Sequence, residues 1–264
     1  MAAVGQTQIK TPTFPREFAP SAFWFSACLN ITVNGALLHN HNSCYLLVGT
    51  HATVLIDTCP PFGWSEFRLQ LAKALNGRAL DYIFPTHPEA PHMGNTGPLL
   101  AQYPMARLIG DLRNYELYFP DAQHRFQPMR AGEVLDLGDR SLVMVPAVVH
   151  DLPNTLWGYE PQHRIVFVSD GYPYTHEHLA GQCAMTSDEL PVSPRPEDTG
   201  VVIESALGWT RHVDAELTIA ALDALLARYP AQIIAPAHGG VITNASKITE
   251  IFKSGLRRVN GVQM

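Results

Sequence analysis

Several common signals are missing from this sequence. Its four cysteines, Cys28, Cys44, Cys59 and Cys183, include no pair at the C-x-x-C spacing, which excludes zinc-ribbon, rubredoxin-type and thioredoxin-type motifs. No apolar run approaches the roughly 20 residues that a membrane helix needs, and the first 15 residues contain no apolar segment of the signal-peptide kind. We therefore expect a cytoplasmic protein in a reducing compartment, without a membrane partner.

Charge is also scarce and dispersed. Charged residues make up 16% of the 264 residues, and the formal net charge of -6 includes no basic run, so we do not expect a nucleic-acid partner. The hydrophobic fraction of 46% is that of an ordinary compact protein. We interpret residues 21–264 as a single domain, and residues 1–20, which hold three prolines, as an extended N-terminal arm.

Histidine, in contrast, is abundant, with twelve residues placed mostly beside Asp, Glu or Pro. The densest stretch directly follows the apolar run Tyr82–Phe84 and reads Thr-His-Pro-Glu-Ala-Pro-His-Met-Gly-Asn, with His87, Glu89 and His92 as its metal-binding side chains. Two imidazoles with one carboxylate suit first-row transition metals and are typical of non-heme iron. Taken alone, the stretch is equally compatible with a solvated polar loop, so the interpretation depends on the rest of the chain.

Apolar runs and turn signals predict alternating strands and helices. Asn34-Gly35 predicts a hairpin within residues 29–48, and Gly138-Asp139 predicts a second one. Residues 171–213 contain several prolines and few regular patterns, so we predict a lid or insertion with short helices there. Helices are predicted from Ser65 to Asn76, after Asn95, from Asp214 to Tyr229 and from Asn244 to Arg257.

Candidate metal ligands follow four of the predicted strands. They are the His87, Glu89 and His92 group, His150 after Val148-Val149, Asp170 after residues 164–168, and His238 after residues 232–235. The carboxyl ends of strands that share a sheet lie on one edge. We therefore expect these side chains to converge on one site.

The order of these motifs resembles the metallo-β-lactamase superfamily over roughly residues 29–245. The set H-x-E-x-x-H-x-G-N, a lone His, S-D-G and A-H-G-G is similar to the branch that contains flavodiiron and oxygen-binding diiron proteins. The resemblance implies an α/β fold, a four-layer αβ/βα sandwich with metals at one edge of two facing sheets. It also implies that one metal binds His87, Glu89 and His150, a second binds His92 and His238, and Asp170 bridges them.

Two positions distinguish this chain within the superfamily. Zinc hydrolases of this fold carry a His where Glu89 stands, and a harder oxygen ligand favours iron or manganese over zinc. The family Asp before the last His of the loop is Pro91 here, and the proline side chain has no ligand atom. The sequence is compatible with two irons or with one. Two are favoured, because the other ligands of both metals are present. A degenerate member that keeps only the fold is the remaining alternative.

The resemblance implies a non-heme iron oxidoreductase that binds or activates O2 or NO, with a small organic substrate as a possible second partner. The chain ends soon after His238, so we expect no FMN-binding flavodoxin domain and an external electron donor. A homodimer is a family expectation. The alternatives are a zinc metallo-hydrolase of ester, thioester or lactone bonds, and a non-catalytic O2, NO or redox sensor.

Some residues outside the ligand set are candidates for catalysis. His41 lies in the early hairpin, and Tyr172 and His178 follow Asp170 closely, so each is a candidate to line the pocket or donate a proton. Asp57, after an apolar run, is interpreted as a carboxylate that orients a metal-bound imidazole. The four cysteines are interpreted as small buried or loop residues.

Overall fold

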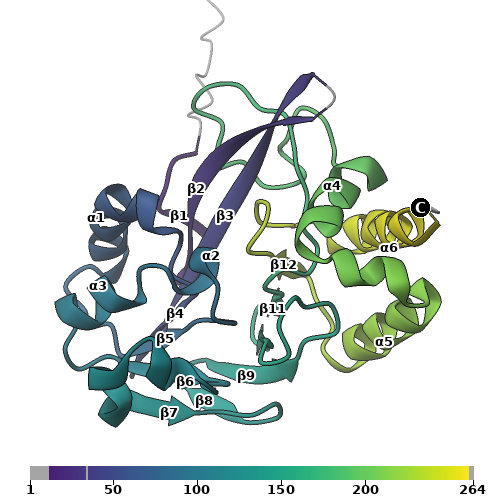
Figure 1. Ribbon diagram of the computed structural model, residues 1–264. Helices are drawn as coiled ribbons and strands as arrows, with labels where there is room; N and C mark the ends of the chain where they lie inside the picture. The colour runs from purple at the N-terminus through teal and green to yellow at the C-terminus, as the bar shows by residue number, and fades with distance from the viewer. Residues whose placement is uncertain (1–11, 34, 262–264) are drawn as a thin grey trace, which may run out of the picture.

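The computed structural model describes residues 12–33 and 35–261 and contains two β-sheets with helices outside them (Figure 1). The seven-stranded sheet has the order β1-β2-β3-β4-β5-β6-β7, and the five-stranded sheet has the order β12-β11-β10-β9-β8. The strands are β1 (Arg16–Ala19), β2 (Ala22–Val33), β3 (Ala36–Val48), β4 (Thr53–Ile56), β5 (Tyr82–Phe84), β6 (Arg107–Gly110), β7 (Phe126–Pro128), β8 (Val134–Asp136), β9 (Ser141–Pro146), β10 (Leu156–Glu160), β11 (Ile165–Phe167) and β12 (Ile233–Ala235). The α-helices are α1 (Trp64–Leu75), α2 (Ala90–Met93), α3 (Thr96–Gln102), α4 (Pro196–Ala206), α5 (Ala215–Arg228) and α6 (Ala245–Gly261).

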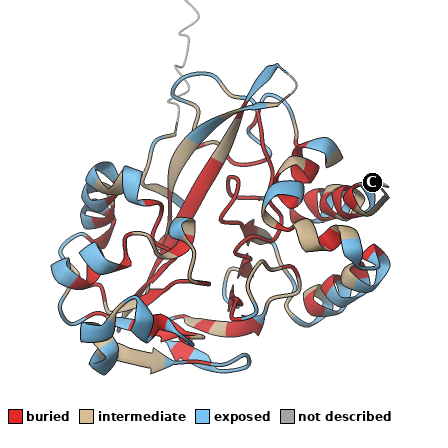
Figure 2. Cartoon of the chain, in the orientation of Figure 1, coloured by how far each residue is buried: buried red, intermediate tan, exposed pale blue. Residues whose placement is uncertain are grey.

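Three layers of apolar side chains hold these elements together. One lies between the sheets and includes Tyr45 and Phe167, one packs α1 and α3 on the seven-stranded sheet, and one packs α4, α5 and α6 on the five-stranded sheet. Figure 2 shows the buried strands at the centre and helices whose outer faces are exposed. This arrangement confirms the predicted four-layer sandwich.

The strands that precede the candidate ligands run parallel to their neighbours. β4, β5 and β6 pair in parallel in one sheet, and β11 pairs in parallel with β12 in the other. Their carboxyl ends therefore deliver loop residues to one edge of the sandwich. The predicted hairpins are also present, as β2 with β3 and as β8 with β9.

Three segments differ from the sequence-based predictions. β1 forms an edge strand that pairs with β2, so the last part of the predicted arm belongs to the sheet; the arm's residues 1–11 lie outside the described residues. β9 ends at Pro146, and Val148-Val149 is therefore loop rather than strand. Residues 171–213 contain α4, which packs against α6, and the role of this segment as a lid stays a prediction.

The helix caps follow the predictions only in part. Asp214 caps α5, and its side chain accepts a hydrogen bond from the backbone N–H of Glu216. Ser65 lies inside α1, which begins after Gly63. Asn95 precedes α3 but its amide donates to the carbonyls of residues 58–60 instead of capping the helix. Within the described parts of the chain, no helix is long and apolar enough to cross a bilayer.

Candidate metal centre

The edge of the sandwich brings five predicted ligands together around Asp170. His87, Glu89 and His92 come from the segment after β5, Asp170 follows β11, and His238 follows β12. One carboxylate oxygen of Asp170, Oδ2, is 3.4 Å from Nε2 of His87. The other oxygen, Oδ1, is 3.0 Å from Nε2 of His92 and 3.2 Å from Nε2 of His238. We call this group, with Glu89, the Asp170 centre.

The facing atoms of the Asp170 centre are buried and lack hydrogen-bond partners. His87 and His92 are fully buried and Asp170 is 1% exposed. Nε2 of both imidazoles and both oxygens of Asp170 have no aligned partner among the residues that the structure describes, although they lie close to one another. An unsatisfied buried polar group costs about 1–3 kcal/mol. The residues therefore fit a bound cation, which would satisfy all of these atoms at once.

The donors divide into two overlapping sets. His87, Glu89 and His92 form one group, and His92, Asp170 and His238 form another, each with ligand atoms within 4.8 Å of one another. Glu89 is 3.6 Å from Nε2 of His87 through Oε2. Because Asp170 faces His87 with one oxygen and His92 and His238 with the other, its carboxylate is placed to bridge two ions.

His150 does not join these groups. Its ring lies 6.0 Å from that of Trp209, whose indole N–H donates to the backbone carbonyl of His150, and its Nδ1 is buried without a hydrogen-bond partner. The structure brings the next residue, Asp151, toward Glu89 instead, where burial and the Glu89 carboxylate raise the pKa of Asp151. Sequence reasoning missed Asp151, because it expected a strand rather than a loop before His150.

A hydrogen-bond network behind the centre fixes the orientation of two imidazoles. Thr86 Oγ1 donates to Oδ1 of Asp57 at 2.9 Å and lies 2.7 Å from Ser169 Oγ. The Ser169 hydroxyl oxygen in turn lies 3.1 Å from Nδ1 of His87. Each contact carries a hydrogen if the His87 Nδ1–H donates to Ser169 and Ser169 donates to Thr86. Asp57 Oδ2 lies 2.9 Å from Nδ1 of His92. With Nδ1 of each ring engaged behind the centre, Nε2 is the nitrogen that each ring offers to a metal.

The turns that carry this network have unusual backbone conformations. Asp57 has φ 58° and Ser169 has φ 50°, in the left-handed region that non-glycine residues rarely adopt. Such conformations persist where surrounding interactions enforce them. Here Thr86 supplies that constraint from the segment after β5, since its backbone N–H and hydroxyl both donate to Asp57. The sequence motif contained Thr86 and Ser169, but only the fold gives them a role.

The loop that carries His238 is held by β3. The backbone N–H of Ser43 donates to the carbonyl of Ala237 at 2.7 Å, and the Ser43 hydroxyl donates to the carbonyl of Gly239 at 2.7 Å. Gly239 has φ 136°, and a Cβ there would come within 2.7 Å of the Tyr174 ring. The turn after β12 therefore needs glycine at this position, next to the ligand.

Burial and neighbouring charges act in opposite directions on two side chains of the Asp170 centre. Burial alone would lower the pKa of His92, but the carboxylates of Asp57 and Asp170 outweigh it and raise this pKa well above its usual value. Burial would likewise raise the pKa of Asp170, yet the imidazoles of His92, His238 and His87 hold it well below its usual range. A proton on His92 thus competes with a metal cation for the same nitrogen.

The three predicted catalytic candidates lie outside the Asp170 centre. His41 and His178 group with Cys28 and Cys183. Tyr172 is fully buried in the layer under α6, where its hydroxyl lies 3.1 Å from Thr249 Oγ1 and its ring stacks on Phe252. The structure therefore does not bring these side chains to Asp170.

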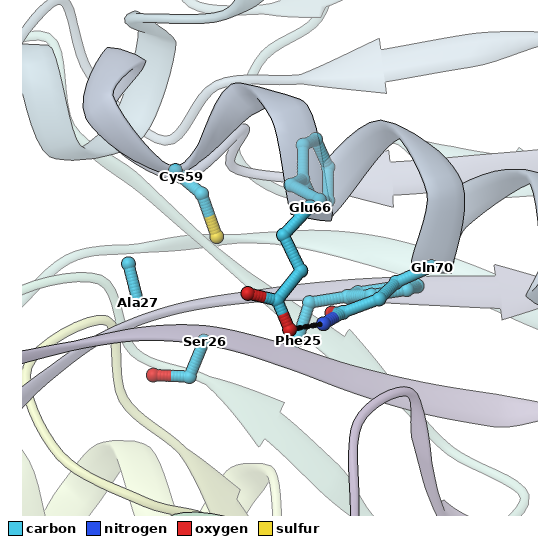
Figure 3. Close-up of a pocket in the computed structure, with 8 residues that line it drawn as sticks. Phe25, Ser26, Ala27, Cys59, Glu66 and Gln70 are labelled. Carbon is cyan, nitrogen blue, oxygen red and sulfur yellow. Dashed lines mark hydrogen bonds between the residues drawn. The ribbon is translucent and has the colours of Figure 1, made fainter.

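A small cavity lies between α1 and β2, near the turn after β4. Its volume is about 50 Å³, and its lining includes Ser26, Cys59, Glu66 and Gln70. Figure 3 shows the thiol of Cys59 and the carboxylate of Glu66 pointing into it, with Glu66 accepting a hydrogen bond from Gln70 at 2.8 Å. Its lining contains none of the ligands of the Asp170 centre.

Comparison with known proteins agrees with this architecture. Residues 39–238 match the family model described as the Metallo-beta-lactamase superfamily. The coenzyme F420H(2) oxidase of Methanothermobacter marburgensis is 24% identical over 226 residues, which cover 80% of this chain and 52% of that protein. The anaerobic nitric oxide reductase flavorubredoxin of Salmonella typhi is 26% identical over 217 residues, 78% of this chain and 43% of that protein.

The same fold occurs in solved structures. The rubredoxin oxygen:oxidoreductase of Desulfovibrio gigas has a TM-score of 0.76 at 18% identity, over 92% of this chain and 61% of that chain. The present chain spans about half the length of the curated relatives that it matches. The matched family model covers most of the chain and every predicted ligand, and the chain therefore belongs to the metallo-beta-lactamase superfamily.

Proposed function

We propose that this chain is a non-heme iron oxidoreductase that binds or activates O2 or NO at a two-ion centre. The observation that carries the proposal is the Asp170 carboxylate, whose two buried oxygens face different imidazoles and have no aligned hydrogen-bond partner among the described residues. Glu89 adds a second oxygen donor, which favours iron or manganese over zinc. The relatives' names, an oxidase, a nitric oxide reductase and an oxygen:oxidoreductase, support the same class of reaction.

In this proposal Asp170 is shared by two ions. The first would be held by His87, Glu89 and Asp170, with His150 as the further donor predicted from the sequence, and the second by His92, His238 and Asp170. When bound, iron(II) supplies the reducing electrons and the coordination positions that the reaction of O2 or NO requires. Around it, the network behind the centre keeps the two Nε2 atoms aimed inward.

Pro91 leaves the second ion with three protein donors. It lies in the first turn of α2, directly before His92, at the place where the resembled family has an aspartate. We propose that the missing carboxylate makes room for a small organic substrate. Pro91→Asp should then lower turnover, measured as O2 or NO consumption with a chemical reductant; unchanged or faster turnover would contradict this role.

A zinc metallo-hydrolase and a sensor are the competing functions. Glu89 and Pro91 replace the His and Asp that zinc hydrolases of the fold carry at these positions, which argues against hydrolysis through a metal-activated water. An external electron donor is part of the proposal, supported by relatives named for coenzyme F420H(2) and rubredoxin. A cytoplasmic location and a homodimer stay proposals as well.

The deciding experiment is metal analysis of the full chain after anaerobic purification from iron-supplemented cells, with an optical spectrum before and after oxygen. We expect two irons per chain and an oxygen-dependent absorption band. His238→Ala should lose iron, whereas His124→Ala, which removes an exposed histidine, should not. Zinc at this centre without any oxygen response would overturn the proposal in favour of hydrolysis. Repeated turnover with a reductant distinguishes an oxidoreductase from a sensor.

A further inference from the structure

A second group of metal-binding side chains lies where the β2–β3 hairpin meets the segment after Asp170. It consists of Cys28 on β2, His41 on β3, and His178 and Cys183 in the following segment, with ligand atoms that all lie within 4.8 Å of one another. We call it the Cys28 cluster. It holds two thiols and two imidazoles and no carboxylate.

Strand pairing places half of the cluster. Cys28 and His41 are direct partners in the antiparallel β2–β3 ladder, so their side chains project from the same face of the sheet. The other half is brought in by an isolated bridge, in which the backbones of His39 and His176 exchange hydrogen bonds of 2.8 and 3.0 Å. This bridge holds the segment that carries His178 against the hairpin.

His41 shows that the cluster is more than a set of neighbouring polar residues. Its side chain is fully buried, and neither ring nitrogen has a hydrogen-bond partner among the described residues. The rings of Trp24 and His176 lie against it at centroid distances of 5.9 and 4.6 Å. An unsatisfied buried polar group costs about 1–3 kcal/mol, and coordination of a metal ion would remove this cost for one of the two nitrogens.

The spacing of the sulfur and nitrogen atoms suits a tetrahedral ion. Sγ of Cys28 is 3.5 Å from Nε2 of His178. Zinc bonds of about 2.3 Å to sulfur and about 2.0 Å to nitrogen, at tetrahedral angles, also place these atoms about 3.5 Å apart. The ring of His39 stacks on His178 at 3.7 Å and places Nδ1 3.2 Å from the same sulfur, which holds both groups in position.

We propose that Cys28, His41, His178 and Cys183 form a tetrahedral zinc site that is separate from the Asp170 centre. Two thiolates and two imidazoles are the donor set of structural zinc sites, in which all four positions are filled by protein. Such a site carries no reaction of its own. It ties the segment after Asp170 to the hairpin.

The zinc site would also stabilise the neighbourhood of the Asp170 centre. The backbone carbonyl of His41 accepts a hydrogen bond from the N–H of Gly239 at 3.0 Å, directly after the ligand His238. A fixed hairpin therefore helps to hold that loop. The inference does not rest on the proposed oxidoreductase function, because the Cys28 cluster holds zinc whether or not iron binds near Asp170.

Cobalt(II) substitution in the full chain tests the site, since thiolate ligands give cobalt an intense charge-transfer absorption that nitrogen and oxygen ligands do not. We expect this band in the wild-type protein, together with one zinc per chain before substitution. Cys28→Ser and Cys183→Ser should each lose the band and the zinc. Asp170→Ala should keep both, because the proposed ligands of the Asp170 centre include no sulfur.

Cys44→Ser is the control, since it changes a cysteine outside the cluster and should keep the band. The inference is overturned if wild-type protein shows no thiolate band, if the band survives in Cys28→Ser and Cys183→Ser, or if it disappears only in Cys44→Ser. A Cys28–Cys183 disulfide in protein purified with reductant, detected by mass spectrometry, would overturn it too. If a serine variant does not fold, His178→Gln, at a partly exposed position, should still weaken cobalt binding and shift the band.

Discussion

The Asp170 centre and the Cys28 cluster are linked through the loop that carries His238, since the Gly239 N–H donates to the carbonyl of His41, yet they offer metals different chemistry. The Asp170 centre combines imidazoles with carboxylates, and its ligand groups hold three donors each. The Cys28 cluster combines imidazoles with thiols, and its four donors are the number that a tetrahedral ion would need. Harder oxygen donors favour iron, and thiolates with imidazoles favour zinc. The comparison indicates that the carboxylates or thiols beside the histidines, rather than the number of histidines, decide which metal each site would bind.

The two sites also differ in what supports them. Behind the Asp170 centre, Asp57, Thr86 and Ser169 form a buried network that orients the imidazoles before a metal binds. Around His41 of the Cys28 cluster, the described part of the chain supplies no hydrogen-bond partner to either ring nitrogen. We therefore expect metal loss to leave the fold around Asp170 intact and to loosen the segment around His178.

The largest expected effect is the loss of iron from the Asp170 centre without any loss of zinc from the Cys28 cluster. Asp170→Ala removes the carboxylate that faces His87 with one oxygen and His92 and His238 with the other, so iron should fall to near zero while zinc stays at one per chain. Elemental analysis of the purified variant measures both metals. Asp223→Ala is the matched control, because this carboxylate lies on the exposed face of α5 and pairs with Lys253 instead. Iron that persists in Asp170→Ala would show that Asp170 does not bridge the ions.

A smaller effect is expected from the network behind the centre. Thr86→Val removes the hydroxyl that connects Asp57 and Ser169, and loss of such supporting contacts lowers metal affinity by about 10–100-fold. Chelator competition should show this loss for iron and no change for zinc. Thr96→Val is the control, since the buried hydroxyl of Thr96 has no hydrogen-bond partner in the described chain. Equal iron affinity in both variants would contradict the proposal that Thr86 orients the ligands.

Iron binding at the Asp170 centre should also depend on pH, through the protonation of His92. Iron needs His92 unprotonated, and Asp57 and Asp170 raise the pKa of His92 well above its usual value. His92 is thus protonated below this raised pKa, so iron affinity is full above it and falls as the pH drops through it. The fall should begin above the ordinary imidazole pKa of about 6.5. Chelator competition that gives constant affinity down to that pH would contradict the prediction.

The smallest effect concerns Tyr172, which the sequence suggested as a catalytic candidate. Tyr172→Phe removes one buried hydrogen bond to Thr249, worth about 1 kcal/mol. Urea denaturation should show this loss of unfolding free energy, while iron content, zinc content and turnover stay at wild-type values. A fall in turnover without a change in stability would restore Tyr172 as a candidate for catalysis.

Local signals explain why much of the fold could be predicted. The β2–β3 hairpin, the strand before Thr86 and the capping by Asp214 all depend on residues close together in the sequence, and each is confirmed. Asn34, on which the hairpin turn was predicted, lies outside the described residues. The error at Val148-Val149 has the same origin, because an apolar run of two residues cannot separate strand from loop. His150 was consequently expected at a strand end that the fold does not contain.

The sequence alone indicated the superfamily, the sandwich and the five side chains of the Asp170 centre. Each of these side chains belongs to a short motif that follows an apolar run, and such a motif can be recognised from consecutive residues. Tertiary structure decided which atoms of Asp170 face which imidazole, and gave Thr86 and Ser169 their roles. It also decided the Cys28 cluster. The hairpin register places Cys28 opposite His41, but His178 lies 150 residues from Cys28 in the chain. Such a site has no C-x-x-C motif in the sequence, because the folded sheet, rather than adjacency in the chain, brings its donors together.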